Sequence, residues 1–152
     1  MSDARETAFF VLSRIEKDSA YANLVLAEMF KNENNCADVK FSYALVKGVL
    51  ERLITLDCML SRCLTQPIKK LKPQVLTILR LGAYQILFMD KVPVSAAVNE
   101  SVKLAKNHGC AFASGLVNAV LRKISSVGEV YPDKSDFIEY LSVKYSFPKY
   151  IC

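Results

Sequence analysis

The most uniformly apolar segment of the chain runs from Leu76 to Pro93, with the sequence LTILRLGAYQILFMDKVP. Its apolar residues occupy almost every side of a helical wheel, which predicts a central, buried helix. The segment is interrupted by Arg80 and falls short of the roughly 20 apolar residues that cross a bilayer, so it is expected in a protein core and not in a membrane. Its polar members Arg80, Tyr84 and Gln85 need hydrogen-bond partners there and predict a polar core.

Helical periodicity continues on both sides of this segment. Helices are predicted from a cap at Ser2 or Asp3, over Tyr21–Lys31, from Asp38 to Leu64 with a break near Thr55 or Asp57, over Ala96–Lys106, over Phe112–Ser125, and from Phe137 to a stop before Pro148. A hydrophobic fraction of 52% with only five Gly and five Pro argues against a turn-rich β fold. The expected fold is therefore all-α, with seven or eight helices around the central one. Asn99 and Asn118 are added to the predicted polar core, and Gly115 predicts a close helix crossing.

The chain shows no arrangement of residues typical of catalysis or metal binding. Its five cysteines form no C-x-x-C pair, His108 is the only histidine, and no Gly-rich phosphate loop or G-x-S-x-G motif occurs. We interpret the cysteines as small apolar fillers and His108 as a surface group at a helix end. An odd cysteine count without a signal peptide is typical of a reduced, cytoplasmic protein. These patterns predict a helical module that binds rather than catalyses, with no metal and no cofactor of its own.

Positive charge is modest overall and concentrated in one place. The net charge is +5, and Lys69, Lys70 and Lys72 fall together in the segment IKKLKP just before the central helix. Two interpretations stay open here: a solvated loop, or a contact for nucleic-acid phosphates, which lysines neutralise without reading bases. Arg122 and Lys123 near the end of a later helix are further candidates for RNA contact. Because no aromatic residue is interleaved with these charges, a preference for structured RNA by shape is expected.

Arg5 has two open interpretations. It is the remaining candidate for RNA contact, at the start of the first helix, and it also lies on a face with Glu6, Arg14 and Lys17 that we interpret as solvated.

Four segments together resemble a known family. They are LVKGVLERLITLD (45–57), ILRLGAYQILFMDKVP (78–93), AAVNESVKLAK (96–106) and GLVNAVLRKI (115–124). In order and spacing they resemble the NusB-like domain, shared by NusB transcription antitermination factors and the N-terminal part of RsmB/Sun-type small-subunit (16S) rRNA (cytosine-C5)-methyltransferases. The resemblance spans nearly all of residues 3–125. It implies two packed three-helix groups joined through a central helix, and a role in RNA binding.

The forms AYQILFMDKVP, AAVNE and GLVNAVLR are more similar to the methyltransferase branch, as is the tail YLSVKYSFPKY (140–150), although Tyr150 stands where Trp is usual. The resemblance implies a NusB-like domain over 1–128 and, over 129–152, the start of a linker to a methyltransferase domain absent from this chain. That domain would hold S-adenosylmethionine and two cysteines in Pro-Cys and Thr-Cys contexts, which none of the five cysteines here reproduces. The implied partners are rRNA and the chain's own methyltransferase domain.

Two features depart from the family pattern. Only Arg5 represents the arginine-rich start of antitermination factors, and Glu51 stands where many methyltransferases have Arg. Two alternatives to the methyltransferase interpretation therefore remain: a free-standing antitermination factor with a ribosomal protein partner, and a helical protein-interaction module without RNA.

Overall fold

The computed structural model describes residues 2–17, 37–128 and 137–146. Its α-helices are α1 (Ser2–Lys17), α3 (Ala37–Glu51), α4 (Leu53–Cys63), α5 (Pro73–Phe88), α6 (Val94–Asn107), α7 (Ser114–Val127) and α8 (Phe137–Tyr145), with short 3-10 turns η2 (Ile68–Lys70) and η3 (Ala111–Ala113). Within these ranges there is no β-strand, so the all-α prediction is confirmed. The helix predicted over Tyr21–Lys31 lies outside the described residues.

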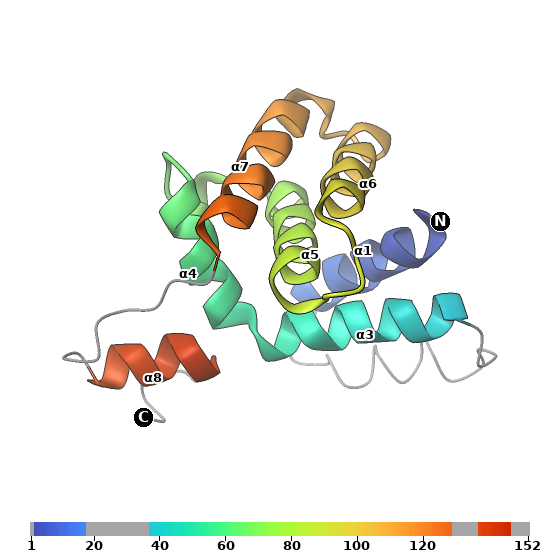
Figure 1. Cartoon of the computed structure of the whole chain (residues 1–152). Helices are drawn as coiled ribbons and strands as arrows, with labels where there is room; N and C mark the ends of the chain where they lie inside the picture. Colours follow the sequence, from blue (N-terminus) through green and yellow to red (C-terminus); the bar gives the residue numbers. More distant parts are fainter. Residues whose placement is uncertain (1, 18–36, 129–136, 147–152) are drawn as a thin grey trace.

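Helix α5 is the centre of the fold, as its apolar sequence predicted. It contacts α1, α3, α4, α6 and α7, which surround it in Figure 1. Ile78, Leu79 and Leu81 are completely buried. The helix begins at Pro73, three residues before the expected start at Leu76, because proline fits the first helical position, where no N–H is needed.

Close packing around α5 depends on two glycines that the periodicity did not single out. A Cβ atom added to Gly48 of α3 would lie 2.0 Å from Cζ of Tyr84, and one added to Gly82 would lie 2.5 Å from Cδ1 of Leu121. The prediction that Gly115 marks a close crossing is wrong, since nothing lies within 4 Å of its Cβ position. Gly115 faces solvent because the side of α7 that packs inward carries Val117, Val120 and Leu121.

Two residues of the predicted polar core, Arg80 and Gln85, have hydrogen-bond partners within the protein. Arg80 donates from Nε and Nη2 to the two carboxylate oxygens of Asp57, both at 2.8 Å, and its Nη1 lies 3.3 Å from Oε2 of Glu16. Gln85 accepts a hydrogen bond from Nε of Arg5 at 2.7 Å and donates to the Leu81 carbonyl at 3.0 Å. The prediction that both side chains are hydrogen-bonded is confirmed.

The other three residues of the predicted polar core, Tyr84, Asn99 and Asn118, lie in different surroundings. Tyr84 is half-buried, and its ring packs in the space left by Gly48 and beside Phe88, with ring centroids 5.8 Å apart. Asn99 and Asn118 are exposed, so their assignment to the core is wrong. The helical phase of α6 and α7 turns both asparagines outward, beside neighbours such as Val98 and Val117 that are completely buried.

The long helical pattern from Asp38 to Leu64 breaks at Arg52, between α3 and α4 and three residues before Thr55, so the predicted break is present but neither Thr55 nor Asp57 caps the second helix. Arg52 has φ −118° and ψ 25° and provides no side-chain cap for α4. Thr55 is buried and donates its hydroxyl to the Val143 carbonyl of α8, while Asp57 pairs with Arg80. Both residues therefore form tertiary contacts and do not begin a helix.

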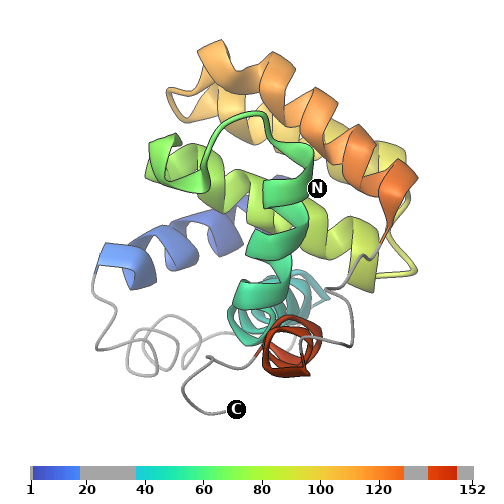
Figure 2. The same ribbon diagram turned by 90° about the vertical axis from the view of Figure 1, so that its left-hand side faces the viewer.

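The missing cap is supplied from the far end of the chain. Oγ of Ser146 accepts hydrogen bonds from the backbone N–H groups of Ile54 at 2.9 Å and Thr55 at 3.4 Å, which lie in the first turn of α4. Ser146 directly follows α8 and has φ 58°, a left-handed conformation. Together with the bond from Thr55, this contact fastens α8 against the start of α4, and Figure 2 shows α8 nearly end-on there.

Candidate nucleic-acid interface

The densest positive surface lies at the N-terminal end of α5. Turn η2 is closed by backbone bonds from Lys70 N to Pro67 O and from Leu71 N to Ile68 O, both 3.0 Å. Ile68 and Leu71 pack partly against the core. Lys69, Lys70 and Lys72 consequently point away from the core, and all three are exposed. The lysines predicted from sequence are thus brought together on one surface.

The same surface includes the start of α5 itself. Lys72 is the N-cap residue and forms no side-chain capping bond. The backbone N–H groups of a helix's first turn carry partial positive charge, which adds to that of the lysines. This end of α5 is therefore suited to an anion such as a phosphate.

An aromatic residue completes this surface, contrary to the expectation that none is interleaved with the lysines. Turn η3 places Phe112, which is 68% exposed, with its ring centroid 5.1 Å from Nζ of Lys72. We refer to Lys69, Lys70, Lys72 and Phe112 as the Lys/Phe surface. A groove of about 350 Å³ lies here, lined by Gln66, Lys70, Leu71, Lys72, Val75, Phe112, Ala113 and Leu116. Sequence reasoning missed Phe112 because it is far from the lysines along the chain.

Arg122 and Lys123 lie in the second half of α7 and are also exposed. Nε of Arg122 donates to Oδ1 of Asn118 at 2.6 Å, a contact between successive turns of the same helix. Lys123 lies close enough to α4 to act on Cys63: burial raises the pKa of this thiol, and the positive charge of Lys123 opposes the increase. Positive charge thus continues along α7 toward the end of α4, from which the chain leads into η2.

Arg5 is not brought together with the lysines. Its Nε bonds to Gln85, which lies about 20 Å farther along α5 than Lys72 at 1.5 Å per residue. The guanidinium group lies 5.2 Å from the centroid of the Phe41 ring, and burial lowers the pKa of Arg5. The expectation that Arg5 lies on a solvated face is wrong, because it joins α1 to α5 and α3.

His108 is also more enclosed than expected. Its ring stacks on Phe9 with centroids 5.0 Å apart and meets Phe10 edge-on at 5.1 Å. Nε2 lies 3.4 Å from Oε1 of Glu6, and only 18% of the side chain is exposed. The prediction of a surface group is therefore wrong, since His108 joins the end of α6 to α1.

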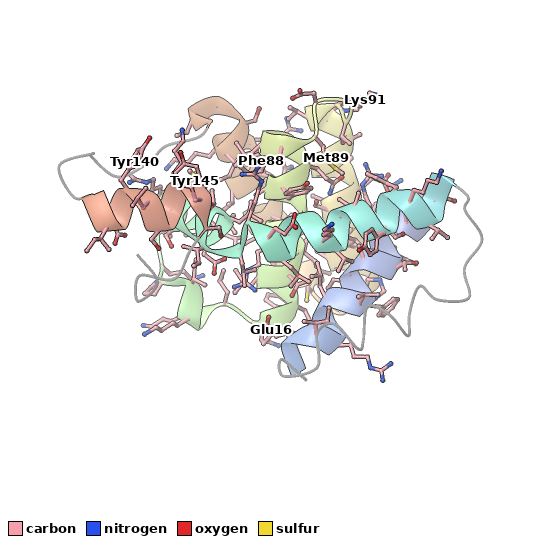
Figure 3. All side chains as sticks on the ribbon, turned by 90° about the horizontal axis from the view of Figure 1, so that it is seen from below. Glu16, Phe88, Met89, Lys91, Tyr140 and Tyr145 are labelled. Carbon is pink, nitrogen blue, oxygen red and sulfur yellow. The ribbon has the colours of Figure 1, made fainter. Side chains whose placement is uncertain are left out.

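A cation and an aromatic ring also contact each other near the other end of α5. Figure 3 shows Phe88, Met89, Tyr140 and Tyr145 on one side of α3 and α8, with Glu16 on the opposite side. The guanidinium carbon of Arg52 lies 4.1 Å from the centroid of the Phe88 ring. This arginine already stacks within the protein, in contrast to the cations of η2.

No group of three or more His, Cys, Asp or Glu side chains in the described ranges could hold a metal ion. No helix in the same ranges is long and apolar enough to cross a membrane.

The chain matches one protein family and is similar in sequence to several known proteins. Residues 2–126 match the model of the NusB family. Probable ribosomal RNA small subunit methyltransferases B from Synechocystis sp. and Bacillus subtilis are 35% and 34% identical, each over 99% of this chain and 34% of the relative. This chain thus spans about a third of the length of these relatives. The transcription antitermination protein NusB of Idiomarina loihiensis is 35% identical over 69% of this chain and 76% of its own length.

Solved structures have the same fold. T. maritima NusB superposes with a TM-score of 0.77 at 22% identity, covering 90% of this chain and 95% of its own. A structure of antitermination factors NusB and NusE in complex with dsRNA superposes with a TM-score of 0.73 at 26% identity, covering 83% of this chain and 96% of the other.

Proposed function

Because this chain belongs to the NusB family, we propose that it is the RNA-binding domain of an S-adenosylmethionine-dependent rRNA (cytosine-C5)-methyltransferase. The observation that carries the proposal is the extent of the two methyltransferase alignments. They cover 99% of this chain, whereas the family match ends at residue 126 and alignments with NusB proteins cover 64–84%. The similarity to methyltransferases therefore includes residues 137–145, which form α8 and pack against α4.

In this proposal the Lys/Phe surface holds the phosphate backbone of rRNA. Lys69 and Lys70 form no ion pair with any residue that the structure describes, so their charge is available to a ligand. Each lysine that neutralises a phosphate releases condensed counterions, which makes binding depend steeply on salt. The domain would position rRNA, and base chemistry would belong to another part of the enzyme.

Catalysis and cofactor binding are assigned to a separate methyltransferase domain. We expect the isolated chain to transfer no methyl group and to leave S-adenosylmethionine unbound. Calorimetric titration of the chain with this cofactor tests the assignment, and binding in the micromolar range would contradict it.

A free-standing antitermination factor is the second candidate, favoured by the superposition on NusB in its complex with NusE and dsRNA. The reading frame downstream of codon 152 distinguishes the two candidates. A following Rossmann-type domain with Pro-Cys and Thr-Cys motifs would support the methyltransferase, and an immediate stop codon would support the antitermination factor.

RNA binding is tested by reversing the charge of the lysines in the Lys/Phe surface. We expect substitution of Lys69, Lys70 and Lys72 by Glu to weaken binding of an rRNA hairpin and to reduce the dependence of affinity on salt. The measurement is fluorescence anisotropy at several salt concentrations. A matched control substitutes Lys40, Lys91 and Lys106 by Glu, which are exposed in α3, in the α5–α6 connection and in α6 and give the same change in net charge. Equal affinity and equal salt dependence in both variants would show that Lys69, Lys70 and Lys72 do not contact the RNA.

A further inference from the structure

We infer that the side of α8 facing away from α4 is a docking surface for the methyltransferase domain of the proposed enzyme. The inference rests on the proposed function and gives α8 a role in domain packing, beyond the linker expected over 129–152. The surface consists of the apolar side chains of Ile138, Leu141 and Tyr145, which we call the α8 stripe.

Helix α8 is apolar on nearly all of its sides. In its sequence, FIEYLSVKY, only Glu139, Ser142 and Lys144 are neither aliphatic nor aromatic. A helix on the surface of a domain usually has one apolar and one polar face, whereas a helix that is apolar all round is buried. In α8 the polar Ser142 is 2% exposed, while Ile138 and Tyr145 are 49% and 54% exposed. This pattern is typical of a helix that is covered on two sides.

One side of α8 is covered by α4. Val143 is 3% exposed, and its carbonyl accepts a hydrogen bond from the hydroxyl of Thr55. One helical turn later, Oγ of Ser146 accepts a hydrogen bond from the N–H of Ile54 at 2.9 Å. These contacts hold α8 in one orientation about its own axis, so its uncovered side is a preformed surface.

The α8 stripe lies on this uncovered side. Ile138, Leu141 and Tyr145 follow each other at spacings of three and four residues, which places them on one face of the helix. Leu141 is half-buried and the other two are exposed. In Figure 2, α8 lies at the edge of the bundle, with the other described helices all on one side of it. A further domain can therefore approach α8 from the opposite side.

The alignments favour a partner that belongs to the same polypeptide. The two methyltransferase relatives align with 99% of this chain and therefore share α8, yet the aligned part is only 34% of their length. The NusB family match ends at residue 126, before α8 begins. The apolar helix thus lies in the part of the chain shared with proteins that contain much more than a NusB-like domain.

Other occupants fit the α8 stripe less well. Three side chains offer roughly a few hundred Å², below the approximately 800 Å² per partner that stable complexes of separate molecules bury. A second copy of the chain would therefore bind weakly through this surface. A tethered domain needs less area, because tethering gives it an effective concentration of about a millimolar. RNA is disfavoured because the stripe contains no cation to neutralise phosphates.

Photocrosslinking in the protein encoded by the complete reading frame tests the contact. We expect p-benzoylphenylalanine in place of Ile138 or Tyr145 to crosslink, within one molecule, to peptides of the methyltransferase domain. The same group in place of Lys144 is the matched control. It has the same tether but projects about 100° away from Tyr145 around the helix, so its yield should be several-fold lower.

Hydrogen exchange gives an independent test. We expect the amides of α8 to exchange at least about tenfold more slowly in the complete protein than in the 152-residue chain, because undocking must precede exchange. Ile138→Ser should remove most of this difference and leave exchange in the 152-residue chain nearly unchanged, since Ile138 is exposed there. Val127→Ser is the matched control, because Val127 is 47% exposed but lies on α7, and it should change neither rate.

The outcomes separate this inference from the proposed function. Docking at the α8 stripe is wrong if positions 138 and 145 crosslink no better than position 144, or only to a second copy or to an added rRNA hairpin. Equal exchange of α8 in the complete protein and in the 152-residue chain would also contradict it. The proposed function survives these results, because a methyltransferase domain can follow without contacting α8. If the complete reading frame encodes no methyltransferase domain, both fail.

Discussion

Positively charged residues lie near both ends of α5, but they differ in whether they have partners within the protein. At the N-terminal end, Lys69 and Lys70 are exposed and form no ion pair with other described residues. From the middle of the helix onward, each neighbouring arginine has an internal partner: Arg80 holds Asp57, Arg5 holds Gln85, and Arg52 stacks on Phe88. This difference predicts that Lys69 and Lys70 are available to a ligand, whereas the three arginines stabilise the fold.

Removing Arg80 should give the largest effect on stability. We expect Arg80→Met to lower the free energy of unfolding by about 2–3 kcal/mol, because Asp57 would keep a half-buried carboxylate without its two-bond partner. Urea denaturation measures the change. Lys70→Met, at the other end of α5, should stay within about 0.5 kcal/mol. Similar losses for both variants would contradict the distinction between paired and unpaired cations.

A double variant sharpens this prediction. If the loss comes from the unpaired carboxylate, then Arg80→Met combined with Asp57→Leu should be less destabilised than the sum of the two single variants. Strict additivity would assign the loss to packing of the Arg80 side chain.

Gly48→Ala should give the next largest effect. The added Cβ would overlap the Tyr84 ring, and we expect a loss of about 2 kcal/mol after the better helix propensity of alanine is included. Gly115→Ala is the matched control. Its Cβ meets nothing, so alanine should stabilise the protein by up to about 1 kcal/mol. Thermal unfolding of both variants measures the difference, and equal effects would mean that α3 and α5 can move apart.

Changes at Ser146 should give the smallest effect of the three. Ser146→Ala removes the acceptor for the Ile54 and Thr55 N–H groups and should cost about 1 kcal/mol. Ser146→Gly removes the same acceptor, but glycine adopts φ 58° without steric cost, so its net effect should be near zero. Hydrogen exchange at Ile54 measures loss of the cap. If this amide is equally protected in the natural chain and in both variants, Ser146 does not cap α4.

Features that depend on the pattern within one helix were predicted correctly. Features that depend on contacts between distant segments were not. The buried helix α5 and the hydrogen bonding of Arg80 and Gln85 follow from placing polar groups in an apolar segment. The break at Arg52 could not be placed, because the cap of α4 comes from Ser146, 92 residues after Ile54.

The candidate site shows the same limit. A local run of charge located Lys69, Lys70 and Lys72, but Phe112 reaches them only through the packing of η3 beside the start of α5. Asn99 and Asn118 were also assigned to the polar core, but each follows a buried residue of its helix, and a step of one position is enough to move a side chain from the core to the surface.

The hydrogen bond between Arg5 and Gln85 has a consequence for the order of events during translation. The two residues are 80 positions apart, so at about 5–20 residues per second roughly 4–16 s pass between their synthesis. Of the described helices that α1 contacts, only α3 precedes α5 in the chain, so the contacts of α1 with α5 and α6 cannot form during that interval. Ala8 and Val11 of α1 are completely buried in the folded protein. Slower translation between codons 17 and 85 would lengthen the exposure of the nascent chain to chaperones and to aggregation.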